Sequence, residues 1–172
     1  MGISLSVLKV TDDHIRRFDE SPNLLEALLV ETIAHGSSGR CYLADYWDGL
    51  DFLLTEGQAK PELPLCALKR GDVTYVGISD PTHAIFSTTT QALARALSLL
   101  DESTLRARFD PQRMLNVGGD GRVVYPGRLW AFPDLAEATF RELMFYFSRL
   151  RDFTAQASEE KKGLLFNRYE DW

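Results

Sequence analysis

The stretch YWDGLDFLLTEG, residues 46–57, carries the spacing that decides the fold. Trp47, Leu50 and Leu54 follow one another at intervals of three and four residues, which is the period of an amphipathic helix. We therefore predict a helix over residues 41–56 that buries this apolar stripe. The glycine that ends the stretch is expected to stop the helix, because glycine readily adopts the left-handed conformation that closes many helices.

The same segment carries three aspartates, Asp45, Asp48 and Asp51, at intervals of three residues. Clustered carboxylates can bind a divalent cation or share a proton. Acidic helix faces are more often simply solvated, and we expect these carboxylates in solvent, with no metal site. Asp48 is the best single acid to test. Its position next to Trp47 is equally consistent with holding the indole N–H or capping a neighbouring segment.

Outside this segment, helical patterns outnumber strand patterns. Strand patterns cover residues 2–9, 65–68, 73–78, 84–86 and 164–166. Helical patterns follow Thr11, Pro22, Thr88 or Thr89, Ser103 and Asp110, and the longest runs from Pro133 to Glu160. Strands and helices do not alternate as a doubly wound fold requires. We therefore predict one α+β domain over residues 1–172, a small mixed sheet packed against several helices.

Composition restricts the classes of partner and compartment. The chain has 172 residues, 45% of them apolar, and a formal net charge of −6. An acidic surface repels phosphate backbones, so no nucleic-acid partner is expected. No apolar run approaches the ~20 residues of a membrane span, and no signal peptide is recognised, which predicts a cytoplasmic protein without a membrane partner. The two cysteines, Cys41 and Cys66, show no metal-binding spacing, and no cofactor is expected.

Three stretches together resemble the YfbM-like family, small bacterial proteins classed as a domain of unknown function. They are residues 46–57, residues 92–110 ending in LRARFD, and the motif VYPG at 124–127 followed by Trp130. The resemblance extends over most of the chain. It implies a cytoplasmic bacterial α+β domain, and it brings no established activity or catalytic residue.

Five residues are candidates for a binding site: Trp47, Asp48, His83, Tyr125 and Trp130. The aromatic members combine apolar rings with polar tips, which suits pockets and interfaces, although such residues more often fill a core. Tyr125 and Trp130 flank a Pro-Gly turn, where partial exposure is expected. His83 follows Asp80 in a predicted loop before a buried strand, a place that often carries function.

These features favour a non-enzymatic binding or interaction module whose partner is another protein. A sharper version is an immunity-type protein that neutralises a toxin, for which small size and acidity are suitable. The alternative is a small hydrolase-like enzyme with an acid–base site near Asp48 and His83. No nucleophile elbow of the form G-x-S-x-G is present, and no catalytic residue is assigned.

Overall fold

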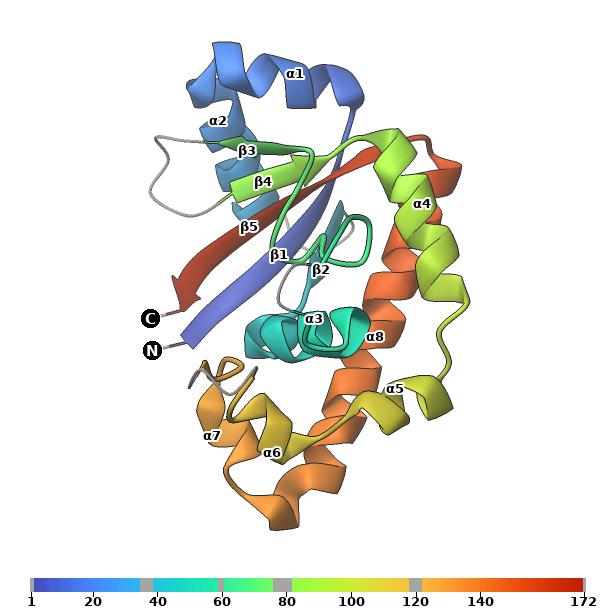
Figure 1. Ribbon diagram of the computed structural model, residues 1–172. Helices are drawn as coiled ribbons and strands as arrows, with labels where there is room; N and C mark the ends of the chain where they lie inside the picture. Colours follow the sequence, from blue (N-terminus) through green and yellow to red (C-terminus); the bar gives the residue numbers. More distant parts are fainter. Residues whose placement is uncertain (1, 35–38, 59–60, 76–81, 118–121, 172) are drawn as a thin grey trace.

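The first and last strands form the centre of the sheet. The computed structural model describes residues 2–34, 39–58, 61–75, 82–117 and 122–171. Strand β1 (Gly2–Val10) pairs antiparallel with β5 (Gly163–Asp171) along their full lengths, from Gly2 opposite Asp171 to Val10 opposite Gly163. The two ends of the chain therefore lie side by side (Figure 1).

Three short strands complete a five-stranded sheet of order β2-β1-β5-β4-β3. They are β2 (Arg40–Tyr42), β3 (Val73–Tyr75) and β4 (Thr82–Ile85). The α+β class is confirmed, but every described strand pairing is antiparallel, so the prediction of a mixed sheet is wrong. Residues 65–68, predicted as a strand, form turns instead.

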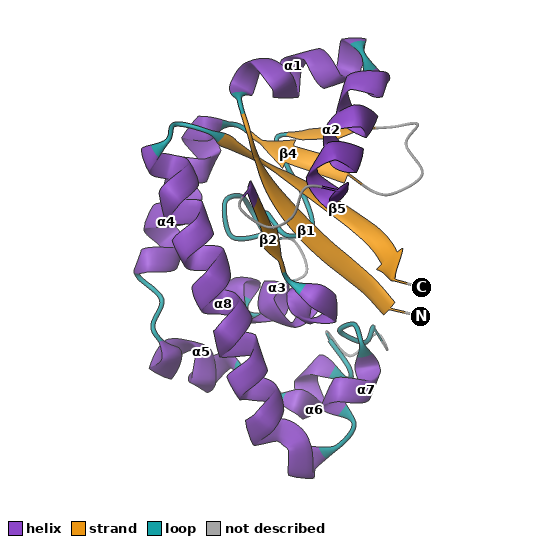
Figure 2. Ribbon diagram, turned by 180° about the vertical axis from the view of Figure 1, so that it is seen from behind, coloured by secondary structure: helices purple, strands orange, loops and turns teal. Residues whose placement is uncertain are grey.

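Alternation along β1 divides the core in two. Leu5 and Val7 belong to a large apolar cluster, whereas Leu8 and Val10 face the opposite way into a smaller one. Helices α1 (Asp12–Glu20) and α2 (Pro22–Ala34) cover the smaller cluster, and α3 (Trp47–Thr55), α4 (Ser87–Ser98) and α8 (Ala136–Glu159) cover the larger one. Figures 1 and 2 show these helices on the two sides of the sheet.

Helix α3 is enclosed on all sides. Each of its residues is buried, and the short helices α5 (Glu102–Arg108), α6 (Pro111–Met114) and α7 (Gly127–Trp130) lie beyond it (Figure 1). It begins at Trp47, after a 3₁₀ turn over Ala44–Tyr46, which is later than predicted because residues 40–42 form the edge strand β2. The helix ends at Thr55, and Glu56 (φ 56°), one residue before the predicted stop, already adopts the left-handed conformation; Gly57 follows with φ 65°.

Local signals at helix starts were informative. Thr11 accepts a hydrogen bond from the His14 N–H at 3.1 Å, and Asp110 accepts one from the Arg113 N–H at 3.1 Å, as predicted for N-caps. Asp101, and not Ser103, caps α5. The predicted long helix is confirmed as α8, preceded by a 3₁₀ turn over Pro133–Leu135.

In the part of the chain that the structure describes, no helix combines the length and apolar character that crossing a bilayer requires.

The close approach of α3 to α7 and α8 generates the first prediction. A Cβ atom at Gly49 would lie 2.6 Å from Cη2 of Trp130, which is itself buried, and 3.1 Å from Cδ2 of Leu143. We expect Gly49→Ala to lower the free energy of unfolding by about 1–3 kcal/mol through overpacking, despite alanine's higher helix propensity. Urea denaturation measures the change. Gly39→Ala is the control, because its Cβ would meet no atom within 4 Å; equal effects of the two changes would contradict the packing argument.

Candidate functional site

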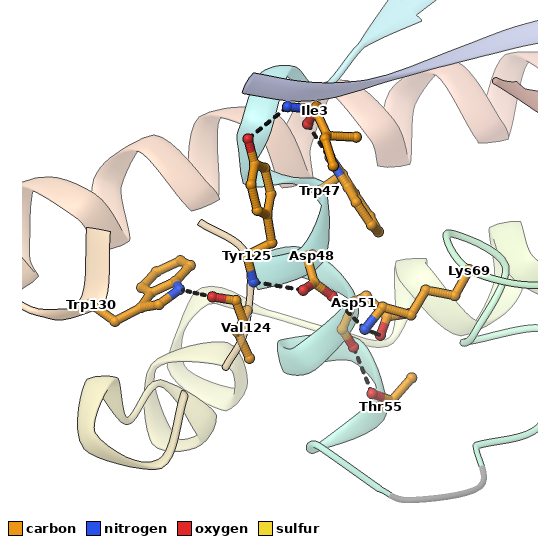
Figure 3. A network of polar contacts seen from close by, with 9 residues as sticks. All are labelled: Ile3, Trp47, Asp48, Asp51, Thr55, Lys69, Val124, Tyr125 and Trp130. Atoms are coloured by element: carbon orange, nitrogen blue, oxygen red, sulfur yellow. Dashed lines mark hydrogen bonds and ion pairs between the residues drawn. The ribbon is translucent and has the colours of Figure 1, made fainter. Parts of the chain in front are cut away.

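Four of the five predicted site residues gather at the start of α3 (Figure 3). Trp47 and Tyr125 both point toward the backbone of Ile3 in β1. The Trp47 Nε1–H donates to the Ile3 carbonyl at 2.9 Å, and the Ile3 N–H donates to the Tyr125 hydroxyl at 2.6 Å. The two ring centroids are 6.5 Å apart. These side chains therefore fix the beginning of β1 against α3.

Asp48 joins α3 to two other segments. Its Oδ2 accepts a hydrogen bond from the Tyr125 N–H at 2.7 Å, and its Oδ1 forms an ion pair with the Lys69 Nζ. Of the two structural roles predicted for Asp48, it therefore has the second: it caps a neighbouring segment at the Tyr125 N–H. It does not hold the Trp47 indole, which donates to the Ile3 carbonyl.

Lys69 lies between two carboxylates. Its Nζ is 3.0 Å from Oδ2 of Asp51 as well as paired with Asp48. The side chains of Asp48 and Asp51 are only 10% and 4% exposed, so the prediction that these two carboxylates are solvated is wrong. The cause is the turn segment at 63–69, which covers this side of α3 and supplies the ammonium group.

The buried charges are balanced by a second cation. Burial raises the pKa of the Asp51 carboxyl, and Lys69 opposes this rise. Burial lowers the pKa of the Arg168 guanidinium, and the charges of Asp48 and Asp51 oppose this decrease. The same guanidinium lies 5.3 Å from the centroid of the Trp47 ring. The two carboxylates thus pair directly with the Lys69 ammonium and interact at longer range with the Arg168 and Arg122 guanidinium groups. The described residues contain no group of three or more His, Cys, Asp or Glu side chains placed to hold a metal ion.

Trp130 is a core residue. Its indole N–H donates to the Val124 carbonyl at 2.7 Å, and its side chain packs against Gly49. The partial exposure predicted for it is not observed, because the residue is only 1% exposed. The bond to Val124 instead fixes the segment whose next residue, Tyr125, donates its N–H to Asp48.

His83 lies apart from this group, on β4. It is 2% exposed, its Nε2–H donates to the Ala67 carbonyl at 2.8 Å, and its ring stacks on Phe166 with centroids 5.0 Å apart. Burial lowers its pKa to about 4, so the ring is neutral at pH 7. Among the described residues no hydrogen bond or ion pair joins His83 to Asp48. Asp80, its proposed neighbour, lies outside the described residues.

Sequence reasoning missed Lys69 and Arg168 as members of this network. Lys69 lies in turns, where hydrophobic periodicity gives no information. Arg168 lies on β5 beyond the apolar run 164–166, where no strand was predicted. A usable signal was the pair of closely spaced aspartates, Asp48 and Asp51, on a helix otherwise rich in large apolar residues.

Removal of the Lys69 ammonium should reveal how much free energy is needed to bury the carboxylates of Asp48 and Asp51 without it. We expect Lys69→Met to lower the free energy of unfolding at pH 7 by about 3 kcal/mol, because it leaves Asp48 and Asp51 facing each other without their shared cation. Adding Asp51→Asn to this variant should recover part of the loss. Arg151→Met is the control, since its exposed ion pair with Asp152 contributes about 0–1 kcal/mol. A Lys69 effect no larger than the control, by urea denaturation, would contradict the analysis.

The buried His83 predicts a pH dependence of stability. Its pKa is about 4 in the folded chain and 6.5 in the unfolded chain, so the unfolded state binds a proton first as the pH falls. The neutral His83 therefore contributes fully to the free energy of unfolding above pH 6.5. This contribution, up to about 3 kcal/mol, is lost as the pH falls from 6.5 toward 4. NMR titration of the imidazole measures the pKa directly, and urea denaturation at pH 7 and 4.5 measures the loss. A His83 pKa near 6.5 would contradict this prediction.

Comparison with known proteins extends this description. The crystal structure of YfbM from Escherichia coli, a protein of unknown function, matches with a TM-score of 0.72 and 20% sequence identity, covering 96% of this chain and 99% of that chain. Identity at this level shows a shared fold. A comparison with curated proteins gave no match. The sequence profile described as "Domain of unknown function (DUF1877)" matches residues 1–167, which confirms the resemblance, and the chain belongs to this family.

Proposed function

We propose that this chain is a non-catalytic protein-binding module of the bacterial cytoplasm. The observation that carries the proposal is an aromatic patch formed by Tyr46, Phe145 and Tyr146 with Arg149 beside it. This patch lies where the 3₁₀ turn at 44–46 meets the middle of α8.

The patch has the side chains and the geometry of an interaction surface. Tyr46 stacks on Tyr146 with ring centroids 5.2 Å apart, and Phe145 meets Tyr146 edge to face, also at 5.2 Å. Phe145 is 55% exposed, and the Arg149 guanidinium lies 5.5 Å from its ring. Aromatic residues and arginine are the residue types that dominate binding energy at protein interfaces. The half-buried tyrosines anchor the patch to the core, so it presents a rigid surface.

The polar groups around the patch also suit a protein partner. Asp45 pairs with Arg128 at its edge. Burial, with the charges of Glu142 and Asp45, raises the pKa of both phenols, whose hydroxyls can donate hydrogen bonds to a partner. The net charge of −6 favours association with a basic protein by electrostatic steering. These properties support the sharper form of the proposal, an immunity-type protein that neutralises a basic toxin.

The alternative, a hydrolase-like enzyme using Asp48 and His83, has less support from the geometry. His83 is buried in its neutral form against Phe166 and the Ala67 carbonyl, and Asp48 is engaged by Lys69 and the Tyr125 N–H. General acid–base catalysis needs both groups within reach of one substrate. Turnover of an ester or phosphoester panel that His83→Gln and Asp48→Asn both abolish, while the variants stay folded, would establish the alternative and refute the proposal.

A direct test measures binding to the product of each gene adjacent to the gene for this chain. We expect one such product to bind, and Phe145→Ala to weaken the complex by about 2 kcal/mol, or thirtyfold in Kd by calorimetry. If that product is toxic, wild-type chain should restore growth and the variant should do so less well. Leu99→Ala is the matched control, because Leu99 is 84% exposed on a different surface, after α4. Binding by no neighbour, or equal binding by Phe145→Ala and the control, would refute the proposal.

A further inference from the structure

A polar row crosses the face of the sheet that α1 and α2 cover. Strand register aligns its members side by side, with Ser6 opposite both Tyr42 and Asn167, and Thr82 opposite both Asn167 and Tyr75. Cross-strand partners point to the same face of a sheet. The neighbouring row on this face is apolar, with Leu8 opposite Leu165 and Leu165 opposite Ala84. The smaller apolar cluster therefore ends at this line.

Arg40 on the edge strand β2 reaches over to this row. It is paired in register with Leu8, yet its Nε–H donates to the Ser6 hydroxyl at 2.7 Å and its Nη2 donates to the Tyr169 hydroxyl. Its guanidinium lies 5.3 Å from the Tyr42 ring and 5.5 Å from the Tyr169 ring. Two hydroxyls and two aromatic rings thus fix the orientation of one half-buried cation.

Arg40 has no carboxylate partner among the described residues. It shares this with Arg16, Arg113 and Arg149, but unlike them it is held by two hydroxyl groups on the face of the sheet. This holds in a chain with 25 acidic and 19 basic residues. A half-buried guanidinium without a carboxylate partner among the described residues can pair with the anionic group of a ligand.

Donors remain at this position for a ligand. A guanidinium has five N–H groups. Two of those of Arg40 donate to Ser6 and Tyr169. The other three, among them both N–H groups of Nη1, have no partner among the described residues. The Tyr169 oxygen accepts hydrogen bonds from Arg40 and from Ser6, the latter at 3.3 Å, so its own O–H is directed to another acceptor. Ser6 and Ser4 beneath are 4% and 2% exposed.

We propose that Arg40 and Tyr169 form a binding site for an oxyanion, the carboxylate or phosphate group of a small ligand. The free edge of the guanidinium presents parallel N–H groups, which match two oxygens of a carboxylate or phosphate. The Tyr169 O–H adds a neutral donor beside them. This site lies on β2 and β5, is built from residues that the aromatic patch does not use, and does not depend on the proposed protein-binding function.

The test uses the full chain with inorganic phosphate and acetate as probes, at constant ionic strength adjusted with chloride. We expect saturable shifts of backbone amide NMR signals in β1, β2 and β5, with a millimolar or tighter Kd for at least one probe. Phosphate binding tighter than acetate identifies a phosphate group, and the reverse identifies a carboxylate. The absence of saturable shifts near Arg40 with both probes would overturn the proposal.

Two variants and a control assign the site. Arg40→Gln should weaken probe binding at least tenfold, and Tyr169→Phe, which keeps the ring, should weaken it severalfold. Arg16→Lys is the control, because Arg16 also lies over an aromatic ring, that of Phe86, at 5.5 Å and should bind the probe unchanged. Equal weakening in the control, or none in Arg40→Gln, would overturn the assignment.

A second measurement requires no variant to fold. Phenylglyoxal modifies accessible arginines, and mass spectrometry locates the adducts. We expect phosphate or acetate to slow modification of Arg40 in the wild-type chain at least threefold relative to Arg16. Modification of both arginines at an unchanged rate with each probe would refute the site.

Discussion

The carboxylate of Asp48 connects parts of the chain that are far apart in sequence. One oxygen receives the Tyr125 N–H and the other faces Lys69, so α3, the segment before α7 and the turns at 63–69 meet at a single side chain. Tyr125 in turn accepts a hydrogen bond from Ile3, which extends the connection to the sheet. Polar contacts therefore add to apolar packing in positioning the segments around α3, because a buried carboxylate is stabilised by specific donors.

Two polar groups of this fold, one beside α3 and one around Arg40, differ in their charge balance. Asp48 and Asp51 face Lys69 and Arg168, so the group beside α3 is compensated from within the chain. Arg40, on the opposite face of the sheet, is held by hydroxyls and rings. The carboxylates beside α3 are compensated by cations of the same chain, whereas the counter-charge that we propose for Arg40 is an external anion. Four of the five site residues predicted from the sequence lie in or beside the group next to α3: Trp47, Asp48, Tyr125 and Trp130.

Features of the fold that depend on neighbouring residues could largely be predicted from the sequence. Features that depend on residues far apart in the chain could not. The strand over residues 2–9, the cap at Thr11 and the Asp110-Pro111 helix start depend on neighbours a few residues away, and each is confirmed. The burial of Asp51 depends on Lys69, whose place against α3 no local pattern encodes. Strand β5 was predicted only over its apolar residues. Its remainder, from Asn167, is held by backbone pairing with β1, to which side-chain polarity is a poor guide.

The pairing of β1 with β5 sets the order in which the fold can be completed. Ribosomes make β1 before the other strands of the sheet and its central partner after them. Until β5 has left the exit tunnel, the nascent chain holds β1 with one unsatisfied edge in the middle of the future sheet, exposed to wrong partners. Contacts of such long sequence separation also slow folding. The sheet can therefore be completed only after β5 has been made, and the vulnerable period is the interval between the synthesis of β1 and that of β5.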